Sequence, residues 1–297
     1  MADIQVFGAP ITKLIEVVSA AIGVKYKPKA MRNEADAKAY EIEKIAEAEA
    51  KASIIRSDAE YEVTERAKQR LYHQEINRQI NIDNIVEEAS NLLNETVSEQ
   101  PIDPNWRTRF FTKAQDITSD EMQLLWAKIL ANEINQPGNF SLRTIDIFSN
   151  LSQYEAETFL KLASISTTSG QIFKINGDIT NFDISYEDLL LLSAAGLVYH
   201  NHELSSTAPP VHVLKHYTNN NELTKEEYGH NFSYRESFIW ICKDNQKLNL
   251  NCYALTKPGV ELLKILDIKD NNDYINSLQS FYLNQGYSVN IVPLQKS

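Results

Sequence analysis

The sequence has few cysteines and no long apolar run. Only Cys242 and Cys252 occur, and their spacing fits neither a CxxC pair nor a disulfide framework. No stretch approaches the ~18 consecutive apolar residues of a membrane span, and the N-terminus lacks a basic segment followed by an apolar one. We therefore expect neither secretion nor transmembrane insertion, and this cysteine usage fits the reducing cytoplasm.

Basic residues are outnumbered by acidic ones. The chain contains 29 Lys and Arg against 40 Asp and Glu, so its net charge is -11. Phosphate backbones and anionic membranes repel such a chain as a whole. We expect no nucleic-acid partner, and contact with a membrane surface, including peripheral attachment to the inner membrane, would require a local basic patch.

Familiar catalytic motifs are absent as well. The sequence contains no Gly-rich phosphate loop, no G-x-S-x-G turn and no H-E-x-x-H motif. Because catalytic geometry can be assembled from residues far apart in the chain, these absences are weak evidence against an enzyme. We nevertheless expect a non-enzymatic protein without a cofactor.

Glycine and proline are missing from about residue 31 to residue 97, where Ala, Glu, Lys and Arg dominate the first half. This composition predicts one long helix, the stalk, over residues 31–100. A thin apolar seam follows it with an average step of about 3.7 residues, near the 11-residue repeat. The seam comprises Ile45, Ala48, Ala52, Ile55, Ala59, Val63, Ala67 and Leu71. So little apolar surface does not hold a lone helix in water, so we expect a coiled coil that joins copies into a homo-oligomer. A single charged helix held by i,i+4 ion pairs is the alternative.

An amphipathic segment precedes the stalk, and we assign residues 1–30 to this helix and a basic linker. Its apolar face and the lysines that follow are Ile11, Leu14, Ile15 and Val18, then Lys25, Lys27 and Lys29. An apolar face beside lysines permits contact with a membrane surface. We favour the alternative, in which this face packs against the protein's own body or a second subunit, because the helix is only ordinarily amphipathic.

Residues 101–165 predict a small helical bundle. Capping patterns place three helix starts, at Ser119 (from Thr118 and Glu121), at Ser141 for a helix to Phe148, and at Ser152 with Glu155. Trp126 and Glu133 share one face of the first of these helices, so the carboxylate could pair with Arg107 or Arg109. We favour this structural ion pair over a carboxylate metal cluster, because no Glu-x-x-His motif accompanies it.

The bundle also carries a resemblance to a known family. Trp106-Arg107-Thr108-Arg109-Phe110 is followed by Leu124-Leu125-Trp126-Ala127-Lys128-Ile129-Leu130-Ala131-Asn132-Glu133 and then by Pro137-Gly138-Asn139-Phe140-Ser141. This run resembles a bacterial family of domains of unknown function related to the Abi-alpha abortive-infection proteins. The resemblance covers roughly residues 8 to 163 and implies a role in defence against bacteriophages, but it identifies no chemical site.

Residues 166–297 predict an α+β domain. Ser185–Val198 is typical of a capped helix, a glycine stop and a strand, and Tyr253–Leu263 is typical of a strand followed by a helix. This order resembles a winged-helix domain with a long hairpin. The first helix carries Glu187 and Asp188 and no basic residue, unlike a DNA-reading helix. We therefore expect a protein-binding or sensing domain, with a winged-helix transcription regulator as the alternative.

The rest of this domain is predicted more coarsely. Residues 238–241 and 249–255 are expected to pair as strands, residues 203–235 to form a mobile insertion, and the end of the chain to form a helix over 274–284 and a strand over 287–292.

Four histidines are the strongest candidates for a metal site. His200 and His202 suit one face of a strand, and His212 and His216 suit one helical turn. No cysteine or Glu-x-x-His motif completes a ligand set, so we favour surface histidines and assign no metal. A metal-dependent hydrolase or nuclease remains a third alternative.

The expected fold class is therefore mainly α, with a long N-terminal helical stalk, a small helical bundle and a C-terminal α+β winged-helix-like domain. The expected function is that of a non-enzymatic, self-assembling bacterial protein in anti-phage defence, acting through protein or membrane-surface contacts.

Overall fold

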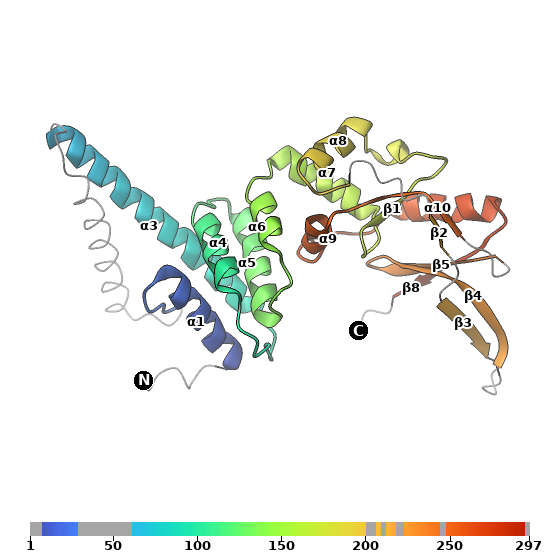
Figure 1. The fold of residues 1–297 in the computed structure, drawn as a ribbon, viewed down its shortest axis with the longest axis horizontal. Coiled ribbons are helices and arrows are strands. Elements are labelled where there is room, and N and C mark those ends of the chain that lie inside the picture. Colours follow the sequence, from blue (N-terminus) through green and yellow to red (C-terminus); the bar gives the residue numbers. More distant parts are fainter. Residues whose placement is uncertain are drawn as a thin grey trace. The chain divides into compact units, whose positions relative to one another are not determined.

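The computed structural model describes residues 8–28, 61–199, 206–208, 212–217, 223–243 and 248–294. Its fold is mainly helical, and short antiparallel sheets lie in the C-terminal part (Figure 1). The chain forms two compact units, Met1–Ile145 and Asp146–Ser297. Lys29 and the seam from Ile45 to Ala59 lie outside the described residues.

Helices alone build the described part of the first unit. They are α1 (Ala9–Ile22), α3 (Tyr61–Asn91), α4 (Pro104–Ala114), α5 (Asp120–Asn135) and the start of α6 (Leu142–Phe148). The C-terminal half of α3 lies along α5 (Figure 1). Helix α3 ends at Asn91, nine residues before the predicted end of the stalk at residue 100. No helix of the described chain is long and apolar enough to cross a membrane.

Helix α1 packs against α3, α4 and α5. Leu14 and Val18 are completely buried, and Ile11 and Ile15 are half-buried. The Lys13 ammonium donates to the backbone carbonyls of Gln100 and Ile134 at 3.0 and 3.2 Å, and also to that of Ser98. The apolar face therefore lies on the protein's own body in this structure, while Lys25 and Lys27 are exposed.

An aromatic cluster forms the centre of the helical core. The ring of Phe110 stacks on Trp106 and lies against Trp126, with centroid separations of 5.0 Å in both pairs. Both tryptophans and Phe110 are buried. Helix α5 begins at Asp120 with Ser119 as its N-cap, one residue later than the start predicted from Thr118 and Glu121, and the Ser119 side chain makes no capping hydrogen bond.

Among the residues that the structure describes, the second unit contains five helical segments besides the end of α6. They are α7 (Gln153–Ser164), the 3-10 turn η3 (Thr180–Phe182), α8 (Tyr186–Ala194), α9 (Lys257–Leu263) and α10 (Asn272–Asn284). Reciprocal capping boxes start α7 and α8: the hydroxyls of Ser152 and Ser185 accept from the backbone N–H three residues later, and Glu155 and Asp188 accept in return. The sequence predicted the starts of both helices.

The strands of this unit form separate antiparallel sheets. Strand β1 (Gln171–Phe173) pairs with β7 (Cys252–Ala254), next to a bridge between Val198 and Leu255. Strand β2 (Ser206–Ala208) pairs with β6 (Leu248–Leu250). A four-stranded sheet has the order β3 (His212–Tyr217), β4 (Leu223–Ser233), β5 (Ser237–Cys242) and β8 (Ser288–Pro293).

One sequence prediction fails here. Residues 203–235, expected to form a mobile insertion, contain β2, β3 and β4, and their mobility stays a prediction. Strand β5 pairs with β4 and β8 rather than with residues 249–255, because β8 places Val289 and Ile291 opposite Ile241 and Ile239. Apolar side chains that face each other on neighbouring strands stabilise the pairing of β5 with β8.

Candidate functional site

The residues of the sequence motif serve the fold of the helical unit. Glu133 is 2% exposed, and its carboxylate accepts hydrogen bonds from the backbone N–H groups of Gly138 at 2.7 Å and Phe140 at 3.1 Å. Burial lowers the pKa of the nearby Lys13, and the negative charge of Glu133 opposes this shift. The carboxylate thus fixes the turn at Pro137 that ends α5, which is a structural role.

The remaining predicted residues form no metal site among those that the structure describes. Arg107 is half-buried and Arg109 is exposed on α4. His200 and His202 lie outside the described residues, whereas His212 and His216 lie on strand β3 and not on a helical turn. Across the residues that the structure describes, no three His, Cys, Asp or Glu side chains are grouped so that they could hold a metal ion.

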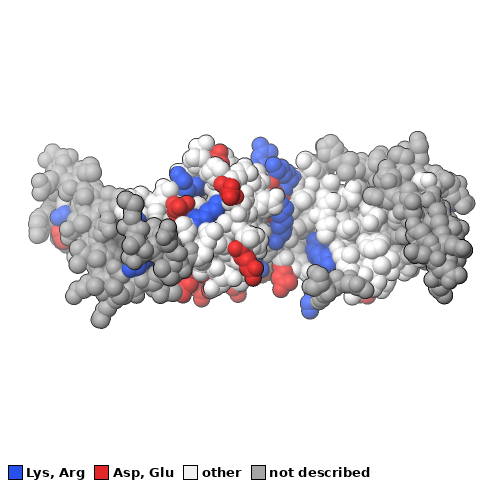
Figure 2. All heavy atoms as spheres, turned by 90° about the horizontal axis from the view of Figure 1, so that it is seen from below, with Lys and Arg blue, Asp and Glu red and all other residues white. Residues whose placement is uncertain are grey.

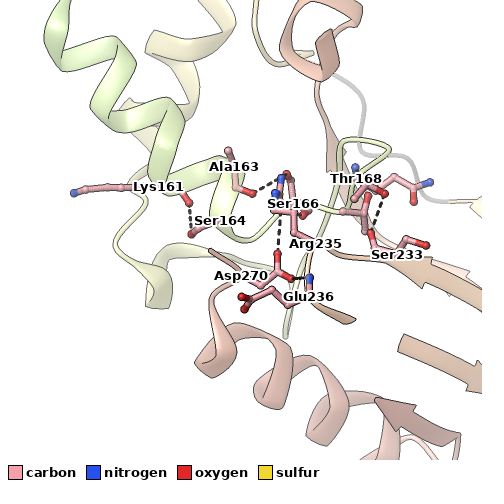
Figure 3. A network of polar contacts seen from close by, with 11 residues as sticks. Lys161, Ala163, Ser164, Ser166, Thr168, Ser233, Arg235, Glu236 and Asp270 are labelled. Carbon is pink, nitrogen blue, oxygen red and sulfur yellow. Dashed lines mark hydrogen bonds and ion pairs between the residues drawn. The ribbon is translucent and has the colours of Figure 1, made fainter. Parts of the chain in front are cut away.

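A buried polar network joins three segments of the second unit (Figure 3). Arg235, in the turn between β4 and β5, donates to the carbonyl of Ser166 at 2.8 Å, to the Ser166 hydroxyl at 3.1 Å and to Asp270 at 3.2 Å. The second oxygen of Asp270 accepts the backbone N–H of Glu236 at 2.8 Å. Asp270 is 1% exposed, and Arg235 is 17% exposed. The network therefore ties the segment after α7 and the segment before α10 to the β4–β5 turn.

An open groove of about 580 Å³ lies where α7, η3 and the start of α8 meet. We call it the α8 groove. It is lined mainly by carboxylates and tyrosines: Tyr154, Glu157, Lys161, Asp183, Tyr186, Glu187 and Asp188 contribute side chains. Tyr154 and Tyr186 are 63% and 60% exposed. Tyrosine side chains that are exposed to this extent are well suited to protein interfaces.

Hydrogen bonds fix the charge of the α8 groove. Asp188 accepts from the backbone N–H and the hydroxyl of Ser185 at 2.9 and 2.8 Å, and from the Tyr154 hydroxyl at 3.1 Å. These bonds, led by the one from the Ser185 backbone, hold the pKa of Asp188 below its ordinary value. Lys161 pairs with Asp183 at 2.6 Å, and this contact raises the pKa of the lysine. The groove therefore carries four carboxylates and one ammonium that is already paired.

This arrangement favours a cationic partner. Carboxylates bind guanidinium and ammonium groups, and the faces of tyrosine rings attract the same cations. Phosphate groups are repelled from such a groove. On the face of the molecule in Figure 2, several Lys and Arg side chains gather in a narrow band, and Asp and Glu side chains lie nearby.

Two of the lining residues of this groove were named from the sequence, but the groove itself was not predicted. The acidic start of α8, with Glu187 and Asp188, is visible as a capped helix without basic residues. Tyr154 and Lys161 are spaced seven residues apart on one face of α7. Nothing in the sequence indicated that this face would lie beside α8 and η3.

Comparison with known proteins gives a family and no characterised relative. A family model described as a protein of unknown function (DUF2806) matches residues 65–279, more than half of the chain. No curated protein and no solved structure matches the chain.

Proposed function

The chain belongs to the DUF2806 family, and from this premise we propose that it is a non-enzymatic, self-assembling bacterial protein that acts in anti-phage defence by binding a cationic protein partner. The family description assigns no activity. The α8 groove, with four carboxylates beside two exposed tyrosines, is the observation that supports the partner-binding part of the proposal.

A winged-helix-like arrangement of the second unit is part of this proposal. Strand β7 lies beside β1, and the bridge from Val198 to Leu255 adds a third chain segment after α8. A helix, a strand, a long connection, a returning strand and a closing helix follow in that order, as in winged-helix proteins. Because the face at the start of α8 is acidic, this helix is suited to a protein rather than to DNA.

The defence role and the self-assembly are supported by the sequence alone. The Trp126 helix and the Pro137 turn resemble the Abi-alpha abortive-infection proteins, and the thin seam of residues 45–71 favours association with further copies. Multivalent display of the α8 groove on an oligomer would raise its effective affinity for a partner that also presents several cationic segments.

Protection from phages in cells tests the proposal. We expect the wild-type protein to lower the number of plaques for at least one phage of a panel, and the charge reversal Glu157→Lys/Glu187→Lys to abolish that protection. The matched control Glu236→Lys/Asp267→Lys makes the same charge change at exposed positions outside the groove. Absence of protection by the wild type, or equal protection by the groove variant, would contradict the proposal.

Two further functions are distinguished by direct binding assays. A transcription regulator would shift DNA in a gel at low salt, with an affinity that falls as salt rises. A membrane-surface protein would sediment with anionic liposomes and lose that binding in Lys25→Glu/Lys27→Glu, because both lysines are exposed. We expect neither behaviour.

A further inference from the structure

A second open groove, of about 910 Å³, runs along α10 and meets the α8 groove at Asp183. We call it the α10 groove. One face of α10 forms part of its lining, with Asp273, Asn276, Ser277, Ser280, Phe281 and Asn284 at helical spacing. The remaining lining comes from the turn at Asn176, from η3 and from the segment before α10.

The opposite face of α10 anchors the helix. Tyr274, Ile275, Leu278 and Tyr282 are buried, and the Tyr274 hydroxyl donates to the carbonyl of Phe173 at 3.0 Å. Phe182 of η3 packs edge-on against the Tyr274 ring, with 5.0 Å between the centroids. The groove is therefore built on a fixed helix whose polar face is turned away from the core.

Neutral amides dominate the lining. Asn176, Asn181, Asn271, Asn276, Asn284 and Gln285 contribute them, together with the hydroxyls of Ser277 and Ser280. Each amide both donates and accepts hydrogen bonds, so such a lining matches a ligand whose groups do the same. Hydroxyl groups meet that requirement, whereas phosphates only accept.

The charge and the aromatic side chains narrow the ligand further. The only ionisable side chains among the lining residues of this groove are Asp183 and Asp273, so the lining disfavours anionic ligands. Phe182 and Phe281 are half-buried and offer apolar surface within an otherwise polar groove. A ligand with hydroxyl groups around its edge and C–H groups on its face would complement both the polar and the apolar side chains of the groove.

The backbone at the groove is unusual as well. Asn176 and Asp183 have positive φ values of 54° and 61°, and both line the groove. Of the described residues other than glycine, these two alone have positive φ. Asn and Asp adopt left-handed backbone more readily than other non-glycine residues, and here it shapes the two turns that line the groove.

We propose that the α10 groove binds a neutral carbohydrate of about two to three sugar units. The amides and serines would hydrogen-bond the sugar hydroxyls, and Phe281 and Phe182 would contact the apolar face of a ring. A cavity of about 910 Å³ lies within the size range of small-molecule sites. This binding does not depend on the cationic partner of the α8 groove.

The test uses the full chain and defined sugars. Binding is screened on an array of neutral and acidic glycans, and hits are measured by titration calorimetry. We expect neutral glycans to bind and sialylated or sulfated ones not to bind. Asn276→Ala and Phe281→Ala each weaken binding about ten-fold or more. The control Asn290→Ala removes an exposed amide outside the groove, on β8, and leaves binding unchanged.

Three results would overturn this assignment. They are no binding of any neutral glycan at millimolar concentration, binding that all three variants retain equally, and a preference for acidic glycans or for nucleosides over neutral sugars. Circular dichroism of each variant separates loss of the site from loss of the fold, because Asn276 and Phe281 are not part of the buried face of α10.

Discussion

Asp270 is the residue on which the packing of the second unit depends most clearly. Its carboxylate is 1% exposed and accepts from Arg235 and from the backbone N–H of Glu236. Asp270→Ala leaves a largely buried guanidinium without this partner, so we expect the second unit to lose about 3–5 kcal/mol of unfolding free energy. Urea denaturation followed by circular dichroism measures it.

The pair of Lys161 and Asp183 is the matched control for this prediction. Its side chains are 52% and 84% exposed, and solvent screens an exposed ion pair. Asp183→Asn, which also tolerates the left-handed backbone at this position, should leave the urea midpoint nearly unchanged. A loss as large as that of Asp270→Ala would contradict the difference in burial that we describe.

The capping carboxylates make the second unit sensitive to acid. Hydrogen bonds from Ser152 and Ser185 lower the pKa values of Glu155 and Asp188 from their ordinary values of 4.5 and 3.8. A lowered folded pKa contributes stability above the unfolded pKa, and this stability is lost as the pH falls through the folded pKa. We expect hydrogen-exchange protection of α8 to fall as the pH drops below about 4, and to fall less in Asp188→Asn. Equal pH dependence in both proteins would remove this explanation.

Glu133 illustrates what a sequence leaves undetermined about one side chain. Helical periodicity correctly placed it on the face of Trp126, and its partner was predicted to be Arg107 or Arg109. That ion pair stays a prediction. The structure adds two partners that the sequence did not indicate, the backbone N–H groups of Gly138 and Phe140. Gly138 has a φ of 92°, and periodicity does not predict such a turn conformation.

At the scale of elements, the position of α1 gives a prediction that separates packing from membrane contact. Leu14 is fully buried against the helices of its own unit. Leu14→Asp should therefore destabilise the first unit by about 3 kcal/mol or more, since it removes apolar contacts and buries a charge. Ala20→Asp places the same charge at an exposed position of α1 and should change little. Trp106 and Trp126, both in this unit, report its unfolding by fluorescence.

Helices were predicted from the sequence more completely than strands. Ser141, Ser152 and Ser185 each precede a helix, because a side-chain oxygen at the N-cap acts on residues only two or three positions away. Strands β3 and β4 are rich in charged and polar residues and show no alternating pattern that would identify them. The partners of β5 come from distant segments, so its register depends on the tertiary fold and not on local sequence.

At the scale of the whole molecule, the grooves depend on segments that the sequence keeps far apart. Residues 154–161, 175–176, 180–188 and 271–285 line them, and the Arg235 network joins the segment after α7 to the segment before α10. Local patterns predicted each helix on its own, but the convergence of α7, η3 and α8 on one groove follows from packing alone. This is why the acidic start of α8 was found in the sequence and its tyrosine neighbour on α7 was not.

Self-association is the property of the whole molecule that the sequence predicts most directly. Alanine occupies half of the seam positions, so one helix alone buries too little apolar surface and several copies bury it together. We expect light scattering to give the wild-type chain a mass several times that of a monomer, and Ile45→Asp/Ile55→Asp to give the monomer mass. Arg56→Asp, off the seam, should keep the oligomer. All three tryptophans lie outside the seam, at positions 106, 126 and 240, so tryptophan fluorescence should report unchanged folding of the two compact units in the monomer. A monomeric wild type would instead mean that the seam packs against a different protein. Plaque protection would then require that partner.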